Sequence, residues 1–175
     1  LLPGEDRAVS ASSDRTVKVW DISTGQCLDT LSGHKRWVNA VAPFPDGRRI
    51  VSASSDGTLR VWDLDPANVG HGKPEVLEGN GDWYSAVTVT RGGLHVLSVS
   101  WRDSALTLWS MAGGGSFRPM ARIAPRTYAD TGRATLDREL GGDVDVSWNA
   151  ALKVWIVQQG DTAEALRGRD GPVCG

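Results

Sequence analysis

Two stretches of the chain alternate polar and apolar residues in the manner of half-buried β-strands. Thr-Val-Lys-Val-Trp at 16–20 and Thr-Leu-Arg-Val-Trp at 58–62 follow this pattern, in which successive side chains point to opposite faces of a sheet. Val-Ser-Ala-Ser precedes each stretch, at 9–12 and 51–54, and predicts a second short strand. Ser-Asp-Arg and Ser-Asp-Gly between the strands predict tight turns. The pattern therefore predicts two β-hairpins of the same design.

The two hairpins are copies of a longer repeat. Residues 10–21 and 52–63 are identical at nine of twelve positions and lie 42 residues apart. Two looser copies follow, and their tryptophans, Trp109 and Trp155, come 47 and 46 residues after the tryptophan of the preceding copy. A period of this length in a chain of short strands is typical of a repetitive β architecture.

The repeat divides the chain into segments of one domain, and the length of 175 residues also favours a single domain. We expect a partial repeat at 1–32, the best-formed repeat at 33–78, a divergent repeat at 79–123, a degenerate repeat at 124–167 and the start of a further repeat at 168–175. In the degenerate copy, Ser147, Asn149 and Trp155 take the places of the strand serine, the turn aspartate and the strand tryptophan.

The sequence resembles the WD-repeat (β-transducin-like) family. Gly33-His34 and the Trp-Asp pairs at 20–21 and 62–63 carry the resemblance. It implies an all-β propeller of about four four-stranded blades, forming an incomplete ring because the chain is a fragment of a longer protein. A compact four-blade ring and a pair of half-rings are the alternatives that the sequence leaves open.

The resemblance also gives a role to a Ser, His and Asp that could suggest a hydrolase. It implies that His34, Ser52, Asp56 and Trp62 form a structural tetrad of hydrogen bonds within one blade, which satisfies buried polar groups. A hydrolase also needs an oxyanion hole and a substrate cleft, and the sequence has no signature of either. We therefore expect no enzyme activity.

The tetrad is incomplete in the other copies. The first copy has a partial tetrad, Ser10, Asp14 and Trp20, without a histidine in the chain before it. In the third copy Asn80 stands at the histidine position. A set of catalytic residues is not expected to be one copy of a structural repeat whose other copies lack some of the same residues.

Two equivalent loops, at 33–39 and 79–85, are the predicted binding surface. Each places a tryptophan, Trp37 or Trp83, three residues after the histidine or asparagine position, and interface hot spots are rich in tryptophan. Asn39 and Ser85 lie two residues further on and are expected to point the same way. In the alternative interpretation, both tryptophans pack between blades. Candidates of lower rank are Trp101 and Trp148, and the loops at 65–75 and 124–133; Arg36 and Asp82 are interpreted as solvated charges.

The composition of the chain bears on which classes of partner, compartment and cofactor are expected. The net charge of −2 does not favour nucleic acid or membrane, and the apolar runs are far shorter than a membrane span. Two cysteines give no disulfide framework, so a reducing compartment, cytoplasmic or nuclear, is expected. Three histidines, with His71 isolated, make no metal cluster, so we expect neither a metal nor another cofactor.

These observations favour a protein-interaction scaffold that binds a protein or peptide through a propeller face. The alternative is a sensor or regulatory propeller of a larger multidomain protein, such as a nucleotide-binding signalling switch. We expect the ring to be completed by missing blades or by self-association. The sequence does not identify the partner.

Overall fold

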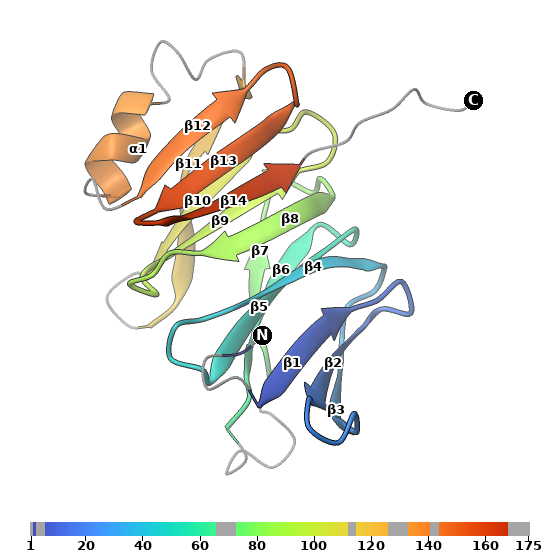
Figure 1. Ribbon diagram of the computed structural model, residues 1–175. Coiled ribbons are helices and arrows are strands. Elements are labelled where there is room, and N and C mark those ends of the chain that lie inside the picture. Colours follow the sequence, from blue (N-terminus) through green and yellow to red (C-terminus); the bar gives the residue numbers. More distant parts are fainter. Residues whose placement is uncertain are drawn as a thin grey trace.

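The structure is a computed structural model. It describes residue 2 and residues 6–65, 73–111, 115–125, 133–140 and 144–167. The chain forms four antiparallel sheets that follow one another in sequence order and do not close into a ring (Figure 1). This is the predicted all-β architecture of propeller blades.

In each sheet, neighbouring strands are consecutive in the chain. The first sheet contains β1 (Arg7–Ala11), β2 (Thr16–Asp21) and β3 (Cys27–Ser32). The second contains β4 (Val38–Pro43), β5 (Arg49–Ser54), β6 (Thr58–Asp63) and β7 (Glu75–Glu78). The third contains β8 (Tyr84–Val89), β9 (His95–Ser100), β10 (Leu106–Met111) and β11 (Phe117–Ile123). The fourth contains β12 (Asp145–Asn149), β13 (Val154–Gln159) and β14 (Thr162–Arg167).

The alternation of each strand divides its side chains between two neighbouring sheets. In the second sheet, Ile50 and Trp62 pack with Val17 and Val19 of the first sheet. The residues that alternate with Ile50 on β5 and with Trp62 on β6 point the opposite way. Leu59 is one of them, and it packs with the third sheet in a separate cluster. Each internal sheet is therefore buried on both faces, and this burial of apolar surface stabilises the stack.

The hairpin turns repeat as closely as the strands. The turn before β2, β6, β10 or β13 contains a residue with a positive φ in each of the four sheets: Arg15 (76°), Gly57 (83°), Ser104 (55°) and Lys153 (51°). Residues with a Cβ are disfavoured in this left-handed region, and glycine is the usual occupant. Only the second sheet places glycine there.

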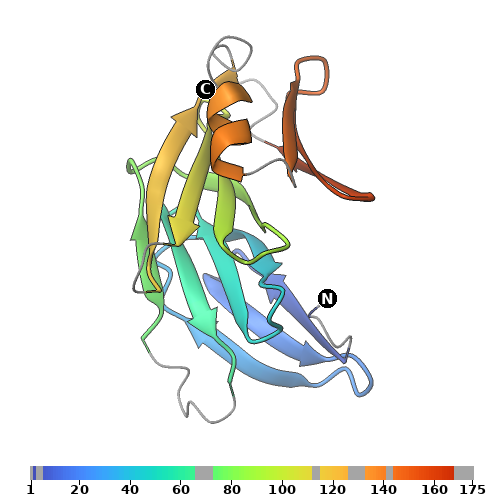
Figure 2. The same cartoon turned by 90° about the vertical axis from the view of Figure 1, so that its left-hand side faces the viewer.

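The second and third sheets have the four strands expected of a blade, and the first sheet belongs to the partial repeat at 1–32. Within the described residues, the first and fourth sheets have three strands each. The fourth repeat contains a helix, α1 (Arg133–Leu140), in the segment before β12. Its Leu136 and Leu140, one helical turn apart, are buried together with Ile123 of β11. Figure 2 shows α1 beside the strands of the third and fourth sheets. None of the helical structure in the described part of the chain is long and apolar enough to cross a membrane.

The fourth sheet is also turned relative to the others. Alignment of Trp155 with Trp20 makes β14 equivalent to β3, the strand on the outer edge of the first sheet. Instead, β14 lies against β8, the first strand of the third sheet (Figure 1). The hydroxyl of Ser85 donates to the carbonyl of Arg167 at 2.8 Å. The backbone amide of Arg91 donates to the side chain of Gln159 at 2.7 Å.

Candidate protein-interaction face

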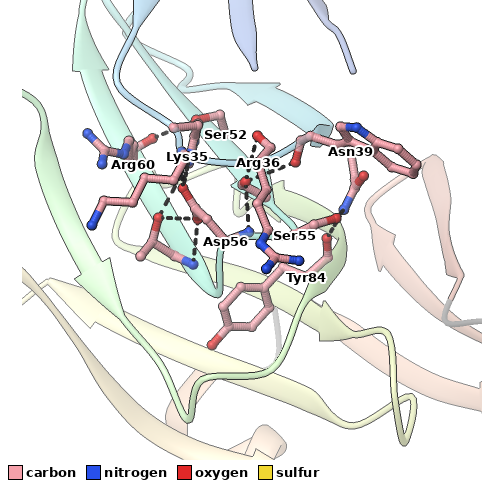
Figure 3. Close-up of polar contacts among 12 residues, drawn as sticks. Lys35, Arg36, Asn39, Ser52, Ser55, Asp56, Arg60 and Tyr84 are labelled. Carbon is pink, nitrogen blue, oxygen red and sulfur yellow. Dashed lines mark hydrogen bonds and ion pairs between the residues drawn. The ribbon is translucent and has the colours of Figure 1, made fainter. Parts of the chain in front are cut away.

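The four tetrad side chains of the second sheet form one chain of hydrogen bonds, in the order Asp56, His34, Ser52 and Trp62. His34 Nδ1 is 2.9 Å from Asp56 Oδ2, and His34 Nε2 is 2.7 Å from Ser52 Oγ. The indole Nε1–H of Trp62 donates to the same Ser52 oxygen at 2.8 Å. Figure 3 shows Ser52 and Asp56 within this network. The network joins the loop before β4 to the hairpin of β5 and β6.

The protonation states follow from the partners. An ionised carboxylate only accepts hydrogen bonds, so His34 donates from Nδ1 and accepts the Ser52 hydroxyl at Nε2. Burial raises the pKa of Asp56, but hydrogen bonds from Thr58, the Lys35 amide and His34 outweigh it and lower that pKa to about 2. Burial lowers the pKa of His34, although Asp56 acts in the opposite direction. A neutral imidazole therefore faces a carboxylate at neutral pH.

The first sheet has the shorter form of this network. Trp20 Nε1 donates to Ser10 Oγ at 2.9 Å, as in the second sheet. Asp14 accepts hydrogen bonds from the amide and hydroxyl of Thr16, at 2.9 and 2.7 Å. Its carboxylate is exposed and has no histidine partner among the described residues, so it organises only its own turn.

In the third sheet an arginine takes the place of the histidine. Trp109 Nε1 donates to Ser98 Oγ at 2.8 Å. Arg122 of β11 donates to Asp103 Oδ2 at 2.6 Å. Burial raises the pKa of Asp103, and the hydrogen bond from Arg122 is the largest of the effects that lower it overall. The turn aspartate therefore keeps a cationic partner, although the repeat position of the histidine holds Asn80.

The predicted equivalence of Ser147 with the other strand serines is wrong. Ser147 is opposite Ile156 and Trp155 is opposite Trp148 in the β12–β13 register. Neighbouring residues of a strand point to opposite faces, so Ser147 and Trp155 lie on different faces of the sheet. Trp155 instead donates to the carbonyl oxygen of Ser104 in the third sheet, at 2.7 Å.

Trp37 and Trp83 occupy equivalent surface positions with fixed backbones. The carbonyl of Trp37 accepts from the Ser55 amide at 2.9 Å, and that of Trp83 accepts from the Trp101 amide at 2.7 Å. The side chain of Trp37 is 63% exposed and that of Trp83 is 39% exposed. The difference follows from Trp101, whose ring lies 5.1 Å from that of Trp83, whereas Ser55 has no ring to cover Trp37.

Arg36 is exposed, in agreement with its interpretation as a solvated charge, whereas Asp82 is half-buried and accepts hydrogen bonds within the protein. The Arg36 guanidinium lies 6.0 Å from the centre of the Trp83 ring, in cation–π geometry. Asp82 Oδ2 accepts the hydroxyl of Ser100, and its Oδ1 accepts the Trp83 amide at 2.9 Å. Both charges therefore contribute to the position of Trp83.

Asn39 and Ser85 make hydrogen bonds between neighbouring sheets. Both are extra residues at bulges, where the strand registers shift between positions 38 and 40 and between 84 and 86. The Asn39 amide donates to Ser55 Oγ at 2.9 Å and to the Tyr84 carbonyl at 2.7 Å (Figure 3). Ser85 donates to the Arg167 carbonyl in the same way. These hydrogen bonds join sheets, so Trp37 and Trp83 are the stronger candidates for partner contact.

Two hollows border Trp83 on this face. One, of about 740 Å³, is lined by Trp83, Trp101 and the side chains around Asp103 and Arg122. The other, of about 370 Å³, lies between the hairpin turn of the first sheet and the loops that carry Trp37 and Trp83. The loops before β4 and β8 and the turns after β1, β5 and β9 thus share one surface, which we call the loop face. Arg15 and Lys35 of the smaller hollow were not predicted as site residues. The replacement of Gly57 by Arg15 at the equivalent turn position is the one sequence difference that marks Arg15.

Several sequence candidates lie wholly or mainly outside the described residues. These are His71, most of the loops at 65–75 and 124–133, and the further repeat at 168–175. Trp148 is partly buried and its ring lies 5.3 Å from that of Trp155. Within the described part of the chain, no group of three or more His, Cys, Asp or Glu side chains could hold a metal ion.

Comparison with known proteins agrees with this geometry. The family model for the WD domain, G-beta repeat, matches residues 2–21 and 25–63. These residues form the first sheet and most of the second, including the tetrad. The match identifies WD repeats within residues 2–63, and the third and fourth sheets continue the same antiparallel architecture beyond the matched residues.

Curated relatives match over a single repeat length. The nuclear distribution protein PAC1 of Arthroderma otae is 58% identical over 40 residues, which are 23% of this chain and 9% of that protein. The PAC1 proteins of Coccidioides posadasii and Arthroderma benhamiae are 54% and 59% identical over 39 residues, covering 22% of this chain and 8% of each relative. The matched segment thus spans less than a tenth of the length of these relatives.

Proposed function

We propose that this chain is a protein-interaction module that binds a peptide or protein partner on its loop face. The exposure of Trp37 is the observation that carries the proposal, since 63% of this large aromatic side chain is open to solvent while its backbone is held by the Ser55 amide. Aromatic side chains on a rigid scaffold offer large contact area at low entropic cost. WD repeats mediate protein–protein interaction in general, which supports the same assignment.

The proposal includes a non-catalytic role for Ser52. Its side chain is fully buried, and its oxygen lies between the imidazole of His34 and the indole of Trp62. A nucleophile has to reach a substrate carbonyl in a cleft, which a buried hydroxyl with these partners does not do. We assign His34, Ser52, Asp56 and Trp62 to the stability of the second sheet.

A cytoplasmic or nuclear location and a partner other than nucleic acid or membrane belong to the same proposal. They rest on the two cysteines and on the net charge of −2. The only described cysteine, Cys27, is free and exposed, as is compatible with a reducing compartment.

Selection from a random peptide library displayed on phage tests the proposed function. The 175-residue chain is the bait, and the affinity of each selected peptide is then measured for the wild type and for the double variant Trp37→Ala, Trp83→Ala. We expect selected peptides to bind the wild-type chain and to lose at least tenfold in affinity for the variant, as is usual for hot-spot tryptophans.

A matched control separates contact from folding. Leu94 and Leu152 are exposed apolar side chains, 55% and 56% open, and neither lines the two hollows of the loop face. The double variant Leu94→Ala, Leu152→Ala should keep full peptide affinity. Circular dichroism must show that all three proteins are folded. Peptides that bind the tryptophan variant as tightly as the wild type would contradict the proposal.

A further inference from the structure

The smaller hollow of the loop face has a distinct chemistry. Its lining includes Ser13, Arg15, Lys35, Arg36, Trp37 and Trp83. We call it the basic pocket, because three cations and no carboxylate contribute to its wall. This local excess of positive charge occurs in a chain whose net charge is −2.

The cations of the basic pocket make no ion pair within the described part of the chain. The carboxylates next in sequence to its lining residues, those of Asp14, Asp56 and Asp82, are already engaged by protein donors. Two unpaired guanidinium groups and an ammonium group beside one hollow favour an anionic ligand, which would form charge-assisted hydrogen bonds.

The backbone of Arg15 is in a conformation that is unfavourable for a residue with a Cβ. Its φ of 76° lies in the left-handed region, where the equivalent residue of the second sheet is Gly57 with a φ of 83°. A residue with a Cβ is strained there, and strain of this kind often persists at functional sites. Glycine would relieve this strain, so the cation at position 15 can be removed without damage to the turn.

Tryptophan rings form the rest of the wall. Trp37 and Trp83 both line the basic pocket, and Arg36 lies over the Trp83 ring at 6.0 Å. A ligand that fits has an anionic group next to an apolar or aromatic group. Side chains of aspartate or glutamate beside phenylalanine or leucine supply this combination in a peptide.

We propose that the basic pocket binds an acidic segment of a protein partner, in which carboxylates face Arg15, Lys35 and Arg36 and an apolar side chain packs on Trp37 and Trp83. The inference rests on the proposed function and names the chemistry of its partner. A protein segment fits better than a nucleic acid, since the cations gather at one small hollow and do not follow a backbone-length groove.

Fluorescence anisotropy tests the inference with defined probes. The first probe is a short labelled peptide of glutamate and aspartate with one central phenylalanine, and the second is the same peptide with glutamine and asparagine instead. We expect the acidic peptide to bind the 175-residue chain at least tenfold more tightly than the amide peptide, with an affinity that falls as salt rises.

Three substitutions remove the cations without breaking the hydrogen bonds around them. Arg15→Gly adopts the same φ without strain, and Lys35→Gln and Arg36→Gln keep the backbone groups that bond Asp56 and Ser54. Each single variant should weaken acidic-peptide binding up to about fivefold, and the triple variant more than tenfold. Arg15→Gly should also melt at the same or a higher temperature than the wild type.

Lys153→Gly is the matched control. Lys153 has the same left-handed conformation, at a φ of 51°, in the turn of the fourth sheet and does not line the basic pocket. It should leave peptide affinity unchanged.

Two results overturn the inference. Equal binding of the acidic and amide peptides, while library-selected peptides still depend on Trp37 and Trp83, would exclude the acidic segment and leave the proposed function intact. Tighter binding of a short single-stranded RNA, with the same dependence on Arg15, would identify the pocket as a phosphate-binding site for nucleic acid. If selected peptides do not depend on the tryptophans either, the proposed function itself fails.

Discussion

Asp14, Asp56 and Asp103 occupy the same turn position in three sheets, yet each has different partners. Asp14 bonds only within its turn, Asp56 bonds the imidazole of His34, and Asp103 bonds the guanidinium of Arg122. The turn geometry is therefore the same in the three sheets, whereas the hydrogen bond that the aspartate makes outside its turn differs between them. How much each aspartate contributes to the free energy of unfolding depends on this hydrogen bond and on the burial of its side chain.

Substitution of Asp56 by Asn should be much more damaging than that of Asp14. Asp56→Asn leaves the buried His34 facing an amide and weakens the bonds to Thr58 and Lys35. We expect a loss of about 2–4 kcal/mol in the free energy of unfolding for Asp56→Asn and a much smaller loss for Asp14→Asn. Urea denaturation measures both, and equal losses would show that His34 contributes little to the stability of Asp56.

Stability should fall as the pH falls below neutrality. Burial lowers the pKa of His34 below its ordinary value of 6.5, so the unfolded chain takes up a proton before the folded one does. Asp56 has a pKa of about 2 and stays ionised throughout this range. The free energy of unfolding should therefore decrease as the pH is lowered from about 7.5 to about 5.5.

His34→Asn is the control for this dependence, because the third repeat has Asn80 at the same position. The variant should be less stable at neutral pH and should show a shallower decrease toward acid. Some slope should remain, since burial also lowers the pKa of His95. An unchanged slope in the variant would assign the titration to other groups.

At the scale of elements, the second sheet and the hairpins of the first and third could be predicted because their strands alternate and their turns repeat. The fourth repeat could not be placed in the same way. A slip of one residue in a strand register moves every side chain to the other face, and alignment of Ser147 with the other serines does not reveal such a slip. The sequence contains one indication of helix α1, which is the spacing of Leu136 and Leu140 by one helical turn.

The contribution of α1 can be measured at Leu136. This side chain is 1% exposed and packs with residues of the third and fourth sheets, whereas Leu152 is 56% exposed. Leu136→Ala should lower the free energy of unfolding by about 2–4 kcal/mol, and Leu152→Ala by less than about 0.5 kcal/mol. Similar small losses for both variants would mean that α1 does not stabilise the adjoining sheets.

The candidate site was predictable only in its tryptophans. The repeat places Trp37 and Trp83 at the same position after the histidine or asparagine of the repeat. The basic pocket depends on how turns from one sheet approach loops of the next, and Arg15 reaches it from the first sheet. Such contacts come from the stacking of sheets, which the pattern within one repeat does not contain.

For the whole molecule, sheets that bury both faces should be the most stable part of the stack. The second and third sheets each have four strands and a neighbour on either side. Hydrogen exchange should be slowest for amides of β5, β6, β9 and β10 and faster for those of β2 and β13, since local stability follows the number of packed neighbours. Uniform protection across all four sheets would instead indicate a single cooperative unit.

The bonds between sheets have a consequence for how such a chain changes over time. Asn39, Ser85 and Trp155 each donate to a backbone carbonyl of a neighbouring sheet, those of Tyr84, Arg167 and Ser104. A main-chain oxygen is present whatever side chain its residue carries. A repeat can therefore duplicate and drift in sequence while its neighbours keep these attachments, and new surfaces can arise on the loops without loss of the stack.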